Sequence, residues 1–316
     1  MQARGGPLVV DHEDVWRFGT IEEQGTPVTV IEFDGRLLPL EALDGSWPDG
    51  PRDVLGILQR WDDWEPALSA AARAARSAAG ALAPEAVAWL PPILVPRKLI
   101  CVGANYRDHL DEMEAELTNT VPYAFLKPTS TLLGSGGSLQ IPAGATWIDW
   151  EAEATIVIGR RMRLARGPAV LEGVAGYTMF NDVSNRDHMD SWQPVIGMDW
   201  LLHKGWDGFG PAGPLITPSR FVVDPQQMGI ELTVNGQVKQ SSNTSKMIFG
   251  IQEILEHLTS VLTLEPGDMI ATGSPAGVGY GRSPRERLVA GDEVAISIQG
   301  LGPPLVTHIV DSEDTA

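Results

Sequence analysis

Cysteine is almost absent from the chain, because Cys101 is the only one in 316 residues. A single cysteine cannot form an internal disulfide, and a protein exported to an oxidising compartment usually has several. The sequence also lacks the run of about 20 apolar residues that a membrane helix requires. Residues 1–16 do not pair a basic stretch with an apolar one, as a secretion signal does. We therefore expect a cytoplasmic protein that has no membrane partner.

Positive charge is scarce as well. Lys and Arg total 23 against 41 Asp and Glu, which gives a formal net charge of −18. This excess of negative charge repels a phosphate backbone, so we expect no nucleic acid partner. Only five of the 23 cations are lysines, and each lysine is therefore a candidate for a specific role.

The composition is that of a globular protein, with 43% hydrophobic and 20% charged residues, and it provides ample apolar material for a core. At roughly 150 residues per domain, the length predicts about two domains. Residues 1–52 mix short apolar runs with Gly, Pro and Asp, which indicates a small β-rich region. Helix formers at helical spacing predict helices over residues 54–64 and 67–82. Because a proline cluster follows, we predict an N-terminal α/β extension over residues 1–95 and a second domain over residues 96–316.

The second domain is expected to consist mainly of strands. Short apolar runs between Gly, Pro and Asn turns predict strands at residues 99–102, 124–126, 139–141, 151–158, 178–180, 231–234, 268–272 and 294–298. The dipeptide Asn235–Gly236 is a strong hairpin signal. Two helices are predicted, a short acidic one over residues 106–116 and a longer one over residues 246–262 with Thr244 or Ser245 as its N-cap. The expected fold class is therefore α+β, mostly β.

Three acidic residues in apolar surroundings form a candidate metal site. Glu151 and Glu153 fall on one face of a predicted strand, where neighbouring carboxylates repel each other unless a cation compensates them. Asp182 ends another apolar strand, a position where site residues often lie. Oxygen ligands without cysteine or clustered histidine favour Mg²⁺ or Mn²⁺ over zinc. Taken separately, the two glutamates are also typical of a solvated strand face, and the aspartate of a turn or cap.

Two further segments carry candidate catalytic residues. His109 and Glu112 lie at positions i and i+3 of the short acidic helix, so that Glu112 could orient the imidazole while His109 takes a proton from water. Lys204 lies in a loop rich in glycine and aromatic residues, where a cation can hold an anionic substrate or a developing oxyanion. The alternatives are an exposed His–Glu surface pair and a solvated loop lysine.

Other chemistries lack a motif in this sequence. The glycine-rich stretch 273–281 follows a strand, but its spacing is not that of a dinucleotide-binding loop and no βαβ pattern surrounds it. There is no serine-hydrolase elbow and no zincin motif. Cys101 lies in an apolar strand, so we expect it to be a core residue and not a nucleophile.

In this order, the residues resemble the fumarylacetoacetate hydrolase family over roughly residues 96–300, in particular its acylpyruvate hydrolase and 2-hydroxyhepta-2,4-diene-1,7-dioate isomerase types. The segments that carry the resemblance are residues 98–106, His109 with Glu112, Glu151 with Glu153, Asp182, Lys204, residues 240–249 and residues 266–279. Two positions depart from the family pattern, since Met189 stands where relatives often carry glutamine and Asn185 where a small residue is common. Both changes are expected to reshape the pocket.

The resemblance implies a mixed β-roll catalytic domain, usually a homodimer, that binds Mg²⁺ or Mn²⁺ through the three carboxylates. The metal would be chelated by the 2-oxo acid end of a small-molecule substrate. His109, held by Glu112, would activate water, and Lys204 would stabilise the developing negative charge. The substrate contacts that the resemblance implies are Thr272, Gly273, Tyr106, Arg107 and Gln240.

The function implied is metal-dependent hydrolysis of a C–C bond in a 2,4-dioxo acid, such as an acylpyruvate or fumarylacetoacetate, through a metal-bound enolate. The same site suits an oxaloacetate-type decarboxylase and a 2-oxo-dienoate isomerase or hydratase. An alternative of another class is a metal-binding protein without catalysis. Tryptophans at positions 147, 150, 192, 200 and 206 favour a larger or more aromatic substrate, or are simply core residues.

Overall fold

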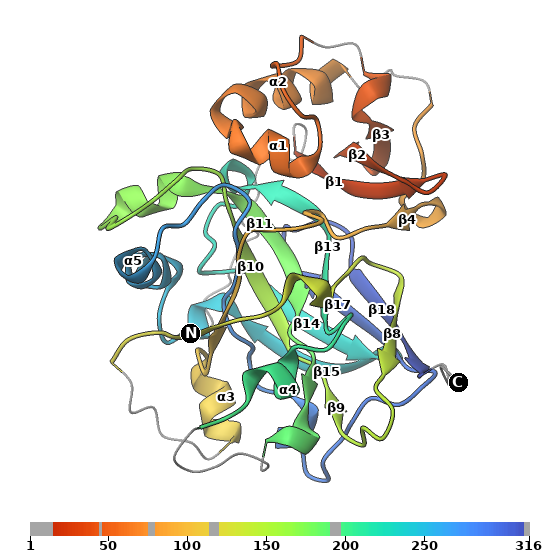
Figure 1. Cartoon of the computed structure of the whole chain (residues 1–316), viewed down its shortest axis with the longest axis vertical. Coiled ribbons are helices and arrows are strands. Elements are labelled where there is room, and N and C mark those ends of the chain that lie inside the picture. Colours follow the sequence, from red (N-terminus) through yellow and green to blue (C-terminus); the bar gives the residue numbers. More distant parts are fainter. Residues whose placement is uncertain (1–14, 44–45, 75–79, 114–119, 190–196, 313–316) are drawn as a thin grey trace, which may run out of the picture.

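An eleven-stranded sheet joins the N-terminal part of the chain to the rest (Figure 1). The computed structural model describes residues 15–43, 46–74, 80–113, 120–189 and 197–312. In spatial order the sheet contains β3 (Arg36–Pro39), β2 (Thr26–Phe33), β1 (Trp16–Glu23), β13 (Gly210–Pro218), β11 (Val174–Asn181), β10 (Ala152–Ile158), β16 (Met269–Ala271), β5 (Leu99–Gly103) and β6 (Tyr123–Leu126), with β4 (Ala88–Trp89) on β1 and β7 (Leu132–Leu133) on β13. Because β1 pairs with β13, the strands of the N-terminal part continue the sheet of the C-terminal part.

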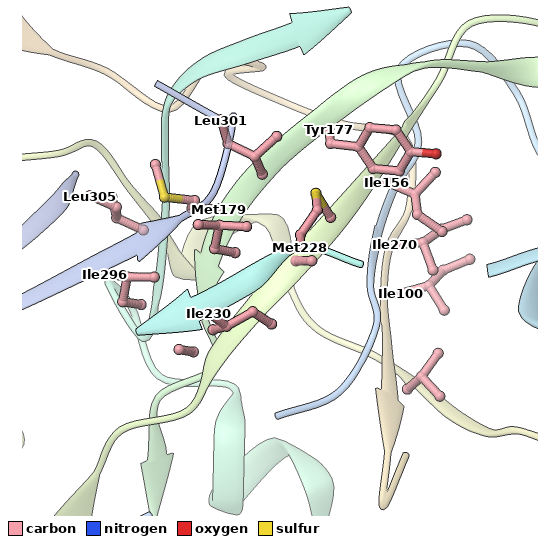
Figure 2. Packing of buried hydrophobic residues seen from close by; sticks show 14 of the residues in the cluster. Ile100, Ile156, Tyr177, Met179, Met228, Ile230, Ile270, Ile296, Leu301 and Leu305 are labelled. Carbon is pink, nitrogen blue, oxygen red and sulfur yellow. The ribbon is translucent and has the colours of Figure 1, made fainter. Parts of the chain in front are cut away.

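A second sheet of five strands encloses the larger hydrophobic core against the first. Its strands are β15 (Gln237–Asn243), β14 (Gly229–Val234), β17 (Glu293–Ile298), β18 (Leu305–Asp311) and β8 (Gly137–Ile141), and a small third sheet pairs β9 (Ile148–Asp149) with β12 (Ser184–Asn185). Figure 2 shows Ile156, Ile270 and Ile100 in a row, because they occupy paired positions on β10, β16 and β5. Ile230 of β14 and Ile296 of β17 belong to the same core.

Three predictions made from the sequence pattern are confirmed at this level. The alternation along β10 is present, since Ala152 and Ile156 face the core between the two sheets whereas Val157 belongs to the core on the other face. The hairpin between β14 and β15 turns at Asn235 and Gly236, which both have positive φ angles of 51° and 73°. The fold is a mixture of helices and strands with strands in the majority, as predicted.

Five α-helices are found in the described part of the chain, and they differ in extent from the predicted ones. They are α1 (Val54–Gln59), α2 (Trp61–Ala74), α3 (Arg107–Glu112), α4 (Trp200–Lys204) and α5 (Ile251–Val261). In Figure 1, α1 and α2 lie beside β1–β3 at one end of the molecule, and α3 and α4 lie at the opposite end. None of the helices within the described ranges is long and apolar enough to span a lipid bilayer.

The predicted N-cap of the longer helix is wrong. Residues 244–246 form a separate 3-10 turn, because the Asn243 side chain accepts a hydrogen bond from the Ser245 N–H at 2.9 Å. The α-helix starts only at Ile251, where Glu253 accepts from the Gly250 N–H at 2.8 Å and closes the first turn. The local side-chain bonds of Asn243 therefore win over the helical spacing that begins at residue 246.

The sequence pattern also missed β13, which is buried over its whole length. The segment contains two glycines and three prolines between Gly210 and Pro218, and this composition predicts a loop. Its neighbours β1 and β11 nevertheless pair with it on both sides. Sheet formation with strands distant in sequence therefore overrides the local preference.

A second core joins the N-terminal part to the main sheet. Phe18 of β1 stacks on Trp61 of α2 with ring centroids 5.5 Å apart, and both residues belong to one cluster with Leu99 and Ala271 of the main sheet. The predicted boundary near residue 95 is therefore bridged by shared packing, although the two-domain division itself stays a prediction.

Replacement of Phe18 with alanine tests this shared core. Phe18 is fully buried, so we expect the Phe18→Ala variant to lose about 3–5 kcal/mol of unfolding free energy in a single transition. Chemical denaturation followed by tryptophan fluorescence and circular dichroism measures this. Val95→Ala, at a side chain that is 65% exposed, is the control and should match the wild type. Two separate transitions, of which only the first is affected, would contradict a shared core.

Candidate active site

Three buried carboxylates converge where β10 and β11 meet. Glu153 lies on β10, Glu151 directly precedes it, and Asp182 directly follows β11. The antiparallel register pairs Ala152 with Asn181, and the Asp182 N–H donates to the Glu151 carbonyl at 2.9 Å, which places the two ends side by side. Oxygen atoms of the three carboxylates lie within 4.8 Å of one another. All three residues are less than 10% exposed, so these carboxylates do not form a solvated strand face.

Three cations from distant segments surround these carboxylates. The Lys204 ammonium at the end of α4 contacts Glu151 at 2.7 Å and Asp182 at 2.5 Å. The Lys127 ammonium, which is fully buried, donates to the other oxygen of Asp182 at 2.5 Å. The Arg186 guanidinium donates to Glu151 at 2.7 Å. Each of these two acids therefore has two cationic partners.

Glu153 lacks such a partner among the described residues and accepts only the Gly273 N–H, at 2.7 Å. Burial and the nearby charge of Asp182 raise the pKa of Glu153 well above its usual value. Burial alone would also raise the pKa of Glu151, but Lys204 and Arg186 outweigh it and hold this pKa well below the usual value. Among the described residues, the negative charges of Glu151 and Asp182 are therefore compensated by cations, whereas that of Glu153 is not.

The donor set fits a hard divalent cation. It offers oxygen atoms from three carboxylates within a small distance, which is the ligand type that Mg²⁺ and Mn²⁺ prefer. A fourth buried acid, Asp149, pairs with Arg186 at 2.9 Å, so four carboxylates face three cations and leave one negative charge. A bound divalent cation would reverse this sign and allow an anionic substrate to enter.

The predicted catalytic pair, His109 and Glu112, lies on α3. His109 Nδ1 is 3.6 Å from a Glu112 carboxylate oxygen, which is close but beyond hydrogen-bond distance. The Glu112 carboxylate instead accepts from the Gly277 N–H, with both oxygens at 3.0 Å. The two side chains are therefore close to each other, as predicted, but the backbone N–H of Gly277 orients Glu112.

Two residues anchor α3 over the site. The Asp108 carboxylate accepts from Ser242 Oγ at 2.7 Å and from the Lys246 ammonium at 3.0 Å. The Asn105 side chain donates to the Thr272 carbonyl at 2.8 Å and accepts from the Phe249 N–H at 2.9 Å. The helix that carries His109 is therefore tied to β15, to the segment after it and to the segment after β16.

A cavity of about 180 Å³ brings the predicted metal and catalytic residues together. Its lining includes the three carboxylates with His109, Arg186, His203 and Lys204, and its apolar wall includes Val102, Met113, Met189, Met198 and Trp200. Met189, one of the two departures from the family pattern, thus lies in the wall. The other, Asn185, is buried and its side chain accepts from the Asp187 N–H at 3.1 Å.

Three of the five residues predicted to bind substrate have other partners in this structure. The Thr272 hydroxyl donates to the Ala154 carbonyl at 2.8 Å, and the Gly273 N–H is used by Glu153. The Gln240 amide spans the Ala152 N–H and Ser274 Oγ, each at 2.9 Å. These three residues support the walls of the cavity, and a direct contact with substrate stays a prediction.

Tyr106 and Arg107 are placed differently from each other. Tyr106 is fully buried, its hydroxyl has no hydrogen-bond partner in the described part of the chain, and burial with the charge of Glu153 raises its pKa well above the usual value. Arg107 is exposed at the start of α3. Neither belongs to the cavity lining.

Of the tryptophans noted in the sequence, Trp200 lines the cavity and stacks on Phe125 at 4.3 Å. Trp150 is a core residue, and Trp147 and Trp206 pack against other aromatic rings. Trp192 lies outside the described residues. The structure therefore gives most of these side chains a packing role.

Sequence reasoning missed Lys127, Arg186, Asp149 and His203 as site residues. The scarcity of lysine pointed to Lys127, and Arg186 lies four positions after Asp182. No sequence pattern links Arg186 to Glu151 or Lys127 to Asp182, because these partners are 35 and 55 residues apart. Their roles become visible only once the strands are paired.

The sequence is similar to a known protein family and to individual proteins. Residues 98–309 match the family model described as fumarylacetoacetate (FAA) hydrolase C-terminal. The chain is 37% identical over 268 residues to oxaloacetate tautomerase Fahd2a, mitochondrial, of Rattus norvegicus, and the match covers 85% of this chain and 82% of that protein. It is 39% identical over 218 residues to an uncharacterized protein of Methanocaldococcus jannaschii, which covers 69% of this chain and 85% of that one.

Solved structures show the same fold over nearly the whole chain. The fumarylacetoacetate hydrolase of Exiguobacterium antarcticum is 30% identical, with a TM-score of 0.79, and the match covers 94% of this chain and 100% of that chain. Maleylpyruvate hydrolase of Sphingobium sp. SYK-6, solved in complex with manganese(II) and pyruvate, is 25% identical with a TM-score of 0.75 and the same coverage. The cavity described above therefore lies in an architecture for which a manganese complex is known.

Glutamine in place of Glu153 tests the metal site. The change keeps the shape of the side chain and removes its negative charge, so we expect Mn²⁺ to bind at least about 100-fold more weakly, since even loss of an outer-shell partner typically costs 10–100-fold. Isothermal titration calorimetry with Mn²⁺ measures this. Glu112→Gln is the matched control and should bind Mn²⁺ like the wild type. Unchanged affinity of Glu153→Gln would contradict the assignment.

Proposed function

The chain belongs to the fumarylacetoacetate hydrolase family, and we propose that it is a divalent-metal-dependent enzyme that interconverts the keto and enol forms of a small 2-oxo dicarboxylic acid such as oxaloacetate. The observation that carries this proposal is that one cavity is lined by the three carboxylates, His109 and Lys204 together. A 2-oxo carboxylate offers two adjacent oxygens to a metal, and the cavity offers a base beside that position.

A divalent cation bound by the three carboxylates would supply the Lewis acid that polarises the 2-oxo group of the substrate. His109 would then remove a proton from C3, so that the C–H electrons form the C2–C3 double bond and negative charge develops on the 2-oxygen. The imidazolium returns its proton to that oxygen and yields the enol. Because Nδ1 of His109 faces Glu112, we assign this proton transfer to Nε2, with Glu112 stabilising the imidazolium.

Lys204 and Arg186 are suited to stabilise the developing charge. Burial alone would lower the pKa of Lys204, but Asp182 and Glu151 raise it above its usual value, so its ammonium stays charged. The guanidinium of Arg186 is likewise kept charged by Asp149 and Glu151 against the effect of burial. Fixed cations inside a water-poor cavity stabilise an oxyanion more strongly than solvent does.

The size of the cavity and the relatives support the choice of substrate class. About 180 Å³ in the described part of the chain is less than the roughly 300–1,000 Å³ of pockets for drug-sized ligands, which favours a small acid. The rat relative named oxaloacetate tautomerase aligns with 85% of this chain. Both observations favour oxaloacetate over a substrate as large as fumarylacetoacetate.

Hydrolysis of a C–C bond in a 2,4-dioxo acid, the prediction from the sequence, is the second candidate. It is favoured by His109 and Glu112, which suit activation of water, and by the similarity to maleylpyruvate hydrolase. Water would lose its proton to His109 and attack the distal carbonyl, and the C–C bond would break to leave the enolate of pyruvate. Decarboxylation of oxaloacetate would leave the same enolate and release carbon dioxide.

We also propose, in line with the sequence, that the enzyme is a cytoplasmic homodimer. The names of the rat and Xenopus laevis relatives place those proteins in mitochondria. Sedimentation equilibrium of the purified protein tests the oligomeric state, and a monomer at micromolar concentration would contradict this part of the proposal.

Alanine in place of His109 tests the assigned base. We expect the rate constant kcat for decay of the oxaloacetate enol, followed by its ultraviolet absorbance with Mg²⁺, to fall about 10²- to 10⁴-fold. EDTA should abolish the wild-type reaction, and Mn²⁺ affinity of His109→Ala should equal that of the wild type. A His109→Ala variant that keeps full activity would exclude this residue as the base.

Product analysis distinguishes the two candidate functions. With oxaloacetate we expect faster enol–keto interconversion without release of carbon dioxide, and with acylpyruvates we expect no pyruvate above the uncatalysed rate. Coupling to lactate dehydrogenase measures pyruvate, and His109→Ala is the control for background reaction. Rapid release of pyruvate from an acylpyruvate would replace the tautomerase proposal with the hydrolase.

A further inference from the structure

His203 is a buried residue of the cavity wall that the proposed chemistry does not use. It lies on α4 next to Lys204, is 2% exposed and lines the cavity. The start of the helix is fixed by Asp199, whose side chain accepts from the Leu201 and Leu202 N–H groups at 3.0 and 3.1 Å. The Trp200 ring meets the His203 ring edge to face, with centroids 5.8 Å apart.

One hydrogen bond fixes the tautomer of His203. Its Nδ1 lies 3.0 Å from the Asn185 carbonyl oxygen, which can only accept a hydrogen bond, so Nδ1 carries the proton. Burial, together with the charges of Lys204 and Arg186, lowers the pKa of His203 to about 3. The ring is therefore neutral near pH 7, and Nε2 presents an unshared electron pair.

The described part of the chain provides no hydrogen-bond partner for Nε2. His203 itself belongs to the lining of the cavity. Nε2 is therefore a hydrogen-bond acceptor in the wall of the cavity that Lys204 and Arg186 also line. A ligand with a hydrogen-bond donor at this position binds more tightly than one without, because an unpaired acceptor in a closed site costs binding free energy. An apolar side chain would have served packing alone.

We propose that His203 is a specificity-determining residue whose Nε2 accepts a hydrogen bond from a hydroxyl group of the substrate. The preferred substrates are accordingly small 2-oxo acids that carry a hydroxyl or enol O–H. This proposal rests on the proposed function, because it assumes that the 2-oxo acid end lies at the three carboxylates.

Two pairs of acids of matched shape test the proposal by binding alone. 3-Hydroxypyruvate and 2-oxobutanoate differ by hydroxyl against methyl, as do 4-hydroxy-2-oxobutanoate and 2-oxopentanoate. Calorimetry on the Mg²⁺-loaded protein should show that at least one hydroxy acid binds about three- to tenfold more tightly than its methyl partner, which corresponds to one net hydrogen bond.

Two variants connect that preference to His203. The amide N–H of His203→Asn can replace the Nδ1 donor to Asn185 but leaves no acceptor at the Nε2 position, so the preference should disappear while 2-oxobutanoate binds as in the wild type. His203→Gln extends an amide oxygen to that position and should retain part of the preference.

Each outcome decides a different claim. If the methyl acids bind and neither hydroxy acid binds more tightly, or if His203→Asn keeps the full preference, the role of His203 is refuted while the proposed function stands. If none of the four acids binds although oxaloacetate does, the role of His203 is refuted and the proposed function stands; if oxaloacetate does not bind either, both proposals fail.

Discussion

The structure depends on the pairing of β10 with β11, because this register brings buried negative charges together. Glu151 and Asp182 lie side by side at the ends of these strands, with Glu153 one pleat away. Buried carboxylates at such distances repel each other strongly unless cations compensate them. Much of the surrounding architecture supplies that compensation. Three separate elements each place a cation beside these carboxylates. Lys127 directly follows β6, Lys204 ends the short helix α4, and Arg186 lies in the turn after β12.

The cations compensate the three buried carboxylates unevenly, and this leaves a position suited to a metal ion. Glu151 and Asp182 are each held by two cations, whereas Glu153 has only a backbone partner among the described residues. A hard divalent cation held by the three carboxylates would compensate Glu153 and would supply positive charge that attracts a dianionic substrate. The proposed base, His109, lies on α3, which is tied to neighbouring segments through Asn105 and Asp108. The proposed metal ligands and the proposed base therefore lie on separate elements, which allows the two roles to be tested independently.

The sequence predicted those parts of the molecule that follow local rules. The alternation along β10 follows from the period-two pattern of a strand, and the turn at Asn235 and Gly236 follows from the preference of this dipeptide for hairpins. The grouping of three acids in apolar surroundings follows from the cost of an isolated buried charge. It could not predict the start of α5, where side-chain bonds of Asn243 compete with the helix, nor β13, whose glycines and prolines are held in place by neighbours on both sides. Lys127 and His203 were missed for the same reason, since their partners Asp182 and Asn185 are neighbours in space and not in sequence.

The most direct test of the central claim is anomalous diffraction from crystals soaked with Mn²⁺ and oxalate, which mimics the two adjacent oxygens of a 2-oxo acid. We predict one strong manganese peak within coordination distance of an oxygen from each of Glu151, Glu153 and Asp182, with oxalate bound to the same ion and facing His109. A peak elsewhere, or no peak with Lys204 still bridging Glu151 and Asp182, would contradict it.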